Sequence, residues 1–87
     1  MDLNLPLIPD QPTPDPILIA AAIPHRLRHG AIHGALGTLS VGEAMVLVAP
    51  HNPLPLLDEI DNRPETFDIS YLTEGPDTWR LRLARTA

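Results

Sequence analysis

The chain has no cysteine, and this absence removes several kinds of chemistry at once. Without a thiol there is no disulfide, no thiolate nucleophile, no persulfide carrier and no cysteine-ligated zinc or iron–sulfur site. Serine and threonine offer no substitute nucleophile, because none of them stands in an elbow motif. The composition therefore favours a non-catalytic binding domain over an enzyme.

Basic residues and long apolar runs are also scarce. Six basic residues stand against 11 acidic ones, and the net charge of −5 opposes the attraction to phosphate backbones and anionic membranes that clustered basic residues provide. The longest apolar run, 17–23, is far shorter than the roughly 20 residues of a membrane span, and the N-terminus lacks the positive region of a secretory signal. We expect a cytoplasmic protein that binds neither nucleic acid nor membrane.

The length of the chain, 87 residues, predicts one domain. A domain of this size buries only roughly 60–65% of its unfolded surface, so any site must be a surface cleft. Proline is concentrated in residues 1–16, where it disfavours both helix and sheet. We expect a Pro-rich flexible arm over 1–16 and a folded domain over 17–87.

Four segments of the folded part have the patterns of strands. Residues 17–22 and 44–49 are short continuous apolar runs, which are typical of buried parallel strands. Residues 67–72 and 78–83 alternate between apolar and polar side chains, and the segment 74–77 between them is rich in turn residues. This last pair predicts an antiparallel hairpin with one face in water.

A helix is predicted after each of the two apolar runs. Pro24 suits the first turn of the first helix, and apolar residues beginning at Leu27 recur at three- and four-residue spacing. For the second helix, Asn52 can act as the cap, Pro53 takes the first position and Leu54 begins the buried side. The resulting order, β-α-β-α-β-β, predicts an α/β (α+β) two-layer sandwich with both helices on one face of a four-stranded mixed sheet.

Four histidines are the most chemically informative residues. His25, His29 and His33 follow one another at four-residue steps, and His51 stands between the second strand and the second helix. An i, i+4 pair on a helix can share one metal ion, but His25 and His33 would lie about 12 Å apart along the axis. Because both strand-to-helix junctions lie at one edge of the sheet, His51 can approach His25 and His29. The sequence thus predicts a site for a transition metal or haem at His29, His51 and His25, with His33 on the surface outside it.

Two other interpretations of this edge stay open. His29 and His51 both lie near helix starts, where an imidazole can hydrogen-bond exposed backbone groups and brace the two junctions. Free N–H groups at the same helix starts also favour a small anion or a partner, with Arg28, Asn52 and Arg26 as contacts. The function that this sequence favours is docking of a protein partner, and the apolar arm together with a short edge strand also permits a homodimer.

Three motifs resemble a known family. They are the strand and proline-rich segment 46–56, the acidic-Gly-Pro turn into Trp-Arg within 71–81, and the Arg28-His29 pair. In this order and spacing they resemble the bacterial domain of unknown function 2249, from about residue 17 to the end. The resemblance implies a fold of the SirA/TusA group, whose sulfur carriers have Cys-Pro where this chain has Ile23-Pro24, so a sulfur-carrier role is not implied. It also implies an association with metal, oxygen or nitrogen-oxide physiology, since related domains occur fused to hemerythrin-like or cupin-like domains.

Overall fold

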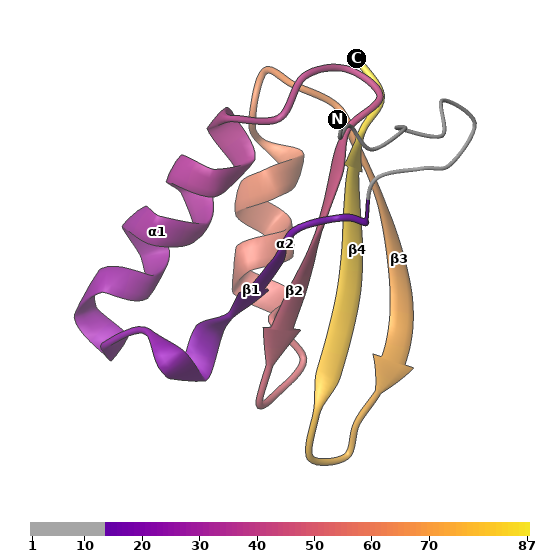
Figure 1. Cartoon of the computed structure of the whole chain (residues 1–87). Coiled ribbons are helices and arrows are strands. Elements are labelled where there is room, and N and C mark those ends of the chain that lie inside the picture. The colour runs from indigo at the N-terminus through magenta and orange to yellow at the C-terminus, as the bar shows by residue number, and fades with distance from the viewer. Residues whose placement is uncertain (1–13) are drawn as a thin grey trace, which may run out of the picture.

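Two helices cover one face of a four-stranded sheet in the computed structural model, which describes residues 14–87 (Figure 1). The elements in chain order are β1 (Ile17–Ile19), a 3₁₀ turn (Ala20–Ala22), α1 (His25–Gly37), β2 (Ala44–Ala49), α2 (Leu54–Asp61), β3 (Phe67–Glu74) and β4 (Trp79–Arg85). The predicted order and the predicted two-layer fold are confirmed. Neither helix of the described part has the length and apolar character needed to cross a membrane.

The strands lie in the order β1-β2-β4-β3. β1 runs parallel to β2, while β4 is antiparallel to both of its neighbours. In this register Leu47 lies opposite Leu81 and Met45 opposite Leu83, so these side chains share the sheet face that the helices cover. Ile32 and Leu36 of α1 and Ile60 of α2 complete the buried core. The core thus fixes both helices over the centre of the sheet.

The opposite face of the sheet is polar along β4, as its alternating pattern predicted. Arg80 and Arg82 are exposed there, and the Arg82 Nε donates a hydrogen bond to an Asp15 carboxylate oxygen at 2.7 Å. The Val46 N–H donates to the Pro16 carbonyl at 2.9 Å. The predicted flexible arm lies outside the described residues except for its last three, of which these two contact the sheet.

The prediction of a buried strand over 17–22 was partly wrong. The strand ends at Ile19, and Ala20–Ala22 form the 3₁₀ turn instead. Ile17 and Ile19 are both exposed, because β1 is an edge strand and they face away from the helices. A continuous apolar run predicts burial on both faces, whereas in this sheet the described elements cover only one.

The first apolar residue predicted on each helix is also exposed, namely Leu27 on α1 and Leu54 on α2. The reason is the period of 3.6 residues per turn. Leu27 precedes the fully buried Leu36 by nine residues, which is two and a half turns and places it on the opposite side of the helix. Leu54 precedes the buried Ile60 by six residues and is rotated away from it in the same manner.

The hairpin turn depends on Gly75. Its φ is +51°, and a Cβ added there would lie 2.7 Å from the Trp79 ring. We expect Gly75→Ala to lower the free energy of unfolding by about 2 kcal/mol, because the left-handed conformation alone costs roughly 1–2 kcal/mol and the indole must also move. Gly34→Ala is the control, since it lies inside α1 with nothing near its added methyl and should stabilise the fold by up to about 1 kcal/mol. Urea unfolding of both variants measures this, and equal effects would contradict the account.

Candidate functional site

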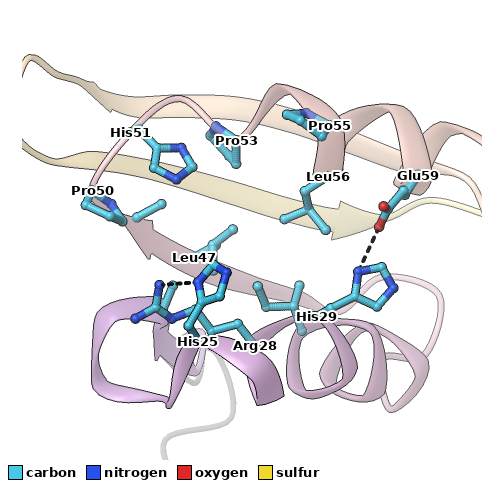
Figure 2. A pocket seen from close by; sticks show the side chains of 13 residues that line it. His25, Arg28, His29, Leu47, Pro50, His51, Pro53, Pro55, Leu56 and Glu59 are labelled. Atoms are coloured by element: carbon cyan, nitrogen blue, oxygen red, sulfur yellow. Dashed lines mark hydrogen bonds and ion pairs between the residues drawn. The ribbon is translucent and has the colours of Figure 1, made fainter.

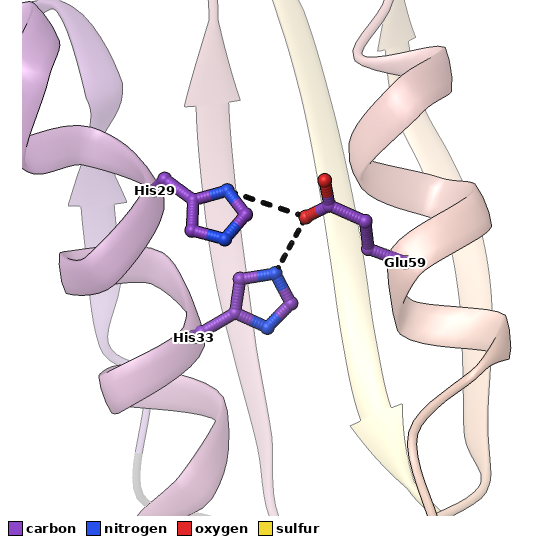
Figure 3. Close-up of side chains that lie close together, drawn as sticks. All are labelled: His29, His33 and Glu59. Carbon is purple, nitrogen blue, oxygen red and sulfur yellow. Dashed lines mark hydrogen bonds and ion pairs between the residues drawn. The ribbon is translucent and has the colours of Figure 1, made fainter.

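A cluster of two histidines and one glutamate joins α1 to α2 (Figure 3). His29 and His33 lie one turn apart on α1, and their rings are neighbours, with centroids 4.6 Å apart and planes tilted by 43°. The Glu59 side chain reaches toward them from α2. His33 Nε2 donates a hydrogen bond to Glu59 Oε1 at 2.8 Å, and His29 Nδ1 lies 3.3 Å from the same oxygen. One carboxylate oxygen therefore serves both imidazoles.

The three side chains differ in their access to water. The His29 side chain is 71% exposed, that of Glu59 43% and that of His33 only 21%. His33 is the least exposed because its ring lies between Glu59 on one side and Arg63 on the other. The cluster is thus accessible to water at His29 and largely shielded from water at His33.

Arg63 defines which nitrogen of His33 carries the proton. Its Nη1 lies 2.9 Å from His33 Nδ1. Since a guanidinium only donates hydrogen bonds, the Nδ1 atom must be the acceptor, and the ring proton must lie on Nε2, which points to Glu59. Both ring nitrogens of His33 are therefore in hydrogen bonds.

Arg63 is itself held in place by Glu65. The Nε atom of Arg63 donates to Glu65 Oε1 at 3.0 Å. This hydrogen bond with the Arg63 guanidinium lowers the pKa of the Glu65 carboxyl. Glu65, Arg63, His33, Glu59 and His29 thus form one continuous chain of polar contacts from the segment after α2 to the middle of α1.

A pocket opens next to this cluster, between the first turns of the two helices (Figure 2). Its volume is about 280 Å³. Ile32, Leu47 and Leu56 contribute to an apolar floor, and His25, Arg28 and His51 lie around it. The Arg28 Nε donates to the Ile23 carbonyl at 2.8 Å, which fixes the direction of the guanidinium.

The residues predicted from the sequence are thus divided between two places. His29 belongs to the cluster, where it meets His33 and Glu59 rather than His25 or His51. His25 and His51 line the pocket, as His29 also does, so the three predicted ligands do share one cleft. His33 does not line this pocket, but the expectation that it is a surface residue was wrong, because its ring turns inward toward Glu59 of α2 and its side chain is mostly covered.

Asn52 does not cap α2 as predicted. Pro53 takes the capping position and no side chain bonds the first turn of the helix. The Asn52 amide oxygen instead accepts a hydrogen bond from the Tyr71 hydroxyl at 2.8 Å. Of the two arginines predicted beside Asn52, Arg28 lines the pocket and Arg26 is exposed on α1.

Sequence reasoning missed Glu59 and Arg63. Glu59 stands in an acidic run that is typical of a solvated helix end, but it follows the core-facing Leu56 by three residues and therefore lies near the same side of α2. This spacing was the available signal. Nothing in the pattern marks Arg63, because it lies beyond the helix in a segment of irregular backbone.

The structure is a small two-layer α/β domain with a histidine-carboxylate cluster between its helices. Residues 20–85 match the family model described as an uncharacterized conserved protein, DUF2249, and the chain belongs to this family. No curated protein and no solved structure matches the chain. The family resemblance of the sequence motifs is thereby confirmed.

Proposed function

We propose that this domain is a non-catalytic binding module that holds one divalent transition-metal ion between α1 and α2. The ligands are His29, His33 and Glu59. The observation that supports this is the mutual distance of their donor atoms, one from each residue, which all lie within 4.8 Å of one another. The sequence predicted an i, i+4 pair at His25 and His29 with His51 as the third ligand, whereas the proposed pair lies one turn further along α1 and its third ligand is the carboxylate of Glu59.

The spacing is close to that of a metal site. Two donors bound at about 2.1 Å in tetrahedral geometry lie roughly 3.4 Å apart. The Glu59 oxygen is 3.3 Å from His29 and 2.8 Å from His33, so small side-chain rotations would open the necessary space. Three protein ligands leave a fourth position, and the exposed His29 side supports access to it from water.

The types of donor atom limit which metal ions the site can bind. Two imidazole nitrogens and one carboxylate oxygen suit Zn²⁺, Ni²⁺, Co²⁺ or Fe²⁺, and the absence of a thiolate disfavours a soft ion such as Cu⁺. A haem, which was the other cofactor predicted, would need a cleft larger than the neighbouring pocket, whose 280 Å³ lies below the usual range for drug-sized ligands. We therefore propose a bare ion.

The competing interpretation is a purely structural bracket between the helices. In its favour, His33 already has both nitrogens satisfied. A metal on Nε2 would move the ring proton to Nδ1, where it would meet the N–H of Arg63. Metal binding therefore requires Arg63 to turn away from His33 and the ring proton to shift from Nε2 to Nδ1, with no net loss of a proton from the imidazole. The need to displace Arg63 lowers the affinity for the metal. It does not prevent binding, because Arg63 keeps its hydrogen bond to Glu65 when it turns away from His33.

The test is calorimetric titration of chelator-treated protein with Zn²⁺. We expect one ion per chain, a higher melting temperature with zinc, and a loss of binding in His29→Ala and His33→Ala. His25→Ala and His51→Ala should bind zinc like the natural chain. Zinc binding that survives His33→Ala but is lost in His51→Ala would instead support the ligand set His29, His51 and His25. If the natural chain binds no zinc, the cluster is a structural contact between the helices.

Other expectations from the sequence stay predictions beside this proposal. They are docking of a protein partner, a kinship with SirA/TusA-like domains, and an association with metal, oxygen or nitrogen-oxide physiology. A metal-binding module agrees with the last of these.

A further inference from the structure

The pocket beside the cluster of His29, His33 and Glu59 points to a second ligand of a different kind. We infer that it binds a small organic monocarboxylate, with the apolar body on the pocket floor and the carboxylate toward Arg28. His29 and Glu59 line this pocket as well, but the inference does not rest on the proposed metal site, because ligand recognition is assigned to Arg28 and to the apolar floor.

The size and lining of the pocket define the body of the ligand. Ile32, Leu47 and Leu56 contribute to the apolar floor, and Ile32 and Leu47 are buried in the core. An apolar cavity of about 150 Å³ takes one benzene molecule. The volume of about 280 Å³ therefore accommodates one ring, or a branched chain of similar size, together with a small polar group.

The charges around the pocket define its other end. Figure 2 shows Arg28, His25 and His51 toward one end and Glu59 toward the other. Among residues 14–87 no carboxylate forms an ion pair with Arg28. Its guanidinium donates to the Ile23 carbonyl and contacts His25 Nδ1 at 3.4 Å, which leaves its second terminal nitrogen without a protein partner in the described part. A prepositioned cation next to an apolar floor selects an anion with an apolar body.

The start of α2 cannot supply this recognition in place of Arg28. At the start of α2, Pro53 and Pro55 have no N–H group. The N–H of Leu54, which lies between them, already donates to the Asn52 carbonyl at 2.9 Å. Glu59 repels an anion, but its carboxylate lies at the far end and is bonded to His33. We therefore assign recognition of the ligand's charge to Arg28, with the imidazoles of His25 and His51 beside it.

The experiment titrates the full chain with benzoate in the presence of a chelator. Binding is monitored by ¹H–¹⁵N NMR. We expect saturable shifts of pocket resonances with a dissociation constant on the order of 1 mM. Benzamide, which has the same shape without the charge, and acetate, which has the charge without the ring, should each bind about tenfold more weakly. Equal binding of acetate, or an absence of saturable shifts at the pocket, would overturn the inference.

Two variants separate a specific contact from general charge. Arg28→Gln should weaken benzoate about tenfold and leave benzamide unchanged, which also shows that the pocket floor is intact. Arg26→Gln is the matched control, since it removes the same charge from the same helix outside the pocket, and it should bind benzoate normally. If both variants bind benzoate equally well, Arg28 is not the contact. Because chelator is present throughout, these results are independent of zinc binding.

Discussion

Replacing Glu59 with glutamine is expected to weaken zinc binding by at least about 100-fold. Loss of an outer-shell partner typically costs 10–100-fold in metal affinity, so loss of a charged ligand costs no less. Glutamine keeps the length of the side chain and an oxygen that can accept the hydrogen bond from His33, but it loses the negative charge that the cation requires. Calorimetric titration with Zn²⁺ measures the change.

The same variant should have little effect on the metal-free fold. Glu59 is partly exposed, and glutamine can still accept the hydrogen bond from His33 through its amide oxygen, so the free energy of unfolding should change by about 1 kcal/mol or less. Asp58→Asn, the same change at the neighbouring exposed residue, is the control and should keep normal zinc affinity. If Glu59→Gln instead destabilises the metal-free protein by several kcal/mol and binds zinc normally, Glu59 belongs to a structural bracket.

Replacing Arg63 with glutamine is expected to strengthen zinc binding by about tenfold. The substitution removes a positive charge near the ion and removes the donor that faces His33 Nδ1. One unit charge at a few ångströms in a partly solvated site is worth roughly 1–2 kcal/mol, and 1.4 kcal/mol corresponds to one power of ten. Glutamine can turn its amide oxygen to Nδ1–H and so accept the proton that metal binding places there.

Arg82→Gln is the matched control for this variant. It removes the same charge on the sheet face away from the helices, where Arg82 pairs with Asp15, and should leave zinc affinity unchanged. The ¹⁵N shifts of the His33 ring provide a second measurement that needs no metal, because the natural chain should carry its ring proton on Nε2. A His33 ring protonated on Nδ1, or a weaker zinc affinity in Arg63→Gln, would contradict this role of Arg63.

The fold was predictable because its signals are local. Proline at residue 24, the apolar run 44–49 and the alternation of residues 79–83 each specify an element within a few residues. The burial of individual residues was less predictable, as the exposed Ile17 shows. Whether a strand lies at the edge of the sheet depends on its partners, and the run of apolar residues carries no information about them.

The site was only half predictable for a related reason. The four-residue spacing of histidines is visible in the sequence, but it fits two pairs, and only the position of α2 selects His29 with His33. That selection is made by Glu59, which reaches the cluster from a helix packed on the same sheet. Arg63 completes the cluster from outside any regular element, so neither periodicity nor a motif indicates it.

A crystal structure of the zinc-loaded protein, with the anomalous signal of the metal, tests the central claim most directly. The account predicts one anomalous peak between α1 and α2, with a nitrogen of His29, the Nε2 atom of His33 and an oxygen of Glu59 at about 2.0–2.2 Å, and with Arg63 turned from His33. A peak bound by His25 and His51, or zinc-soaked crystals in which His33 still lies hydrogen-bonded between Glu59 and Arg63 with no peak, would contradict it.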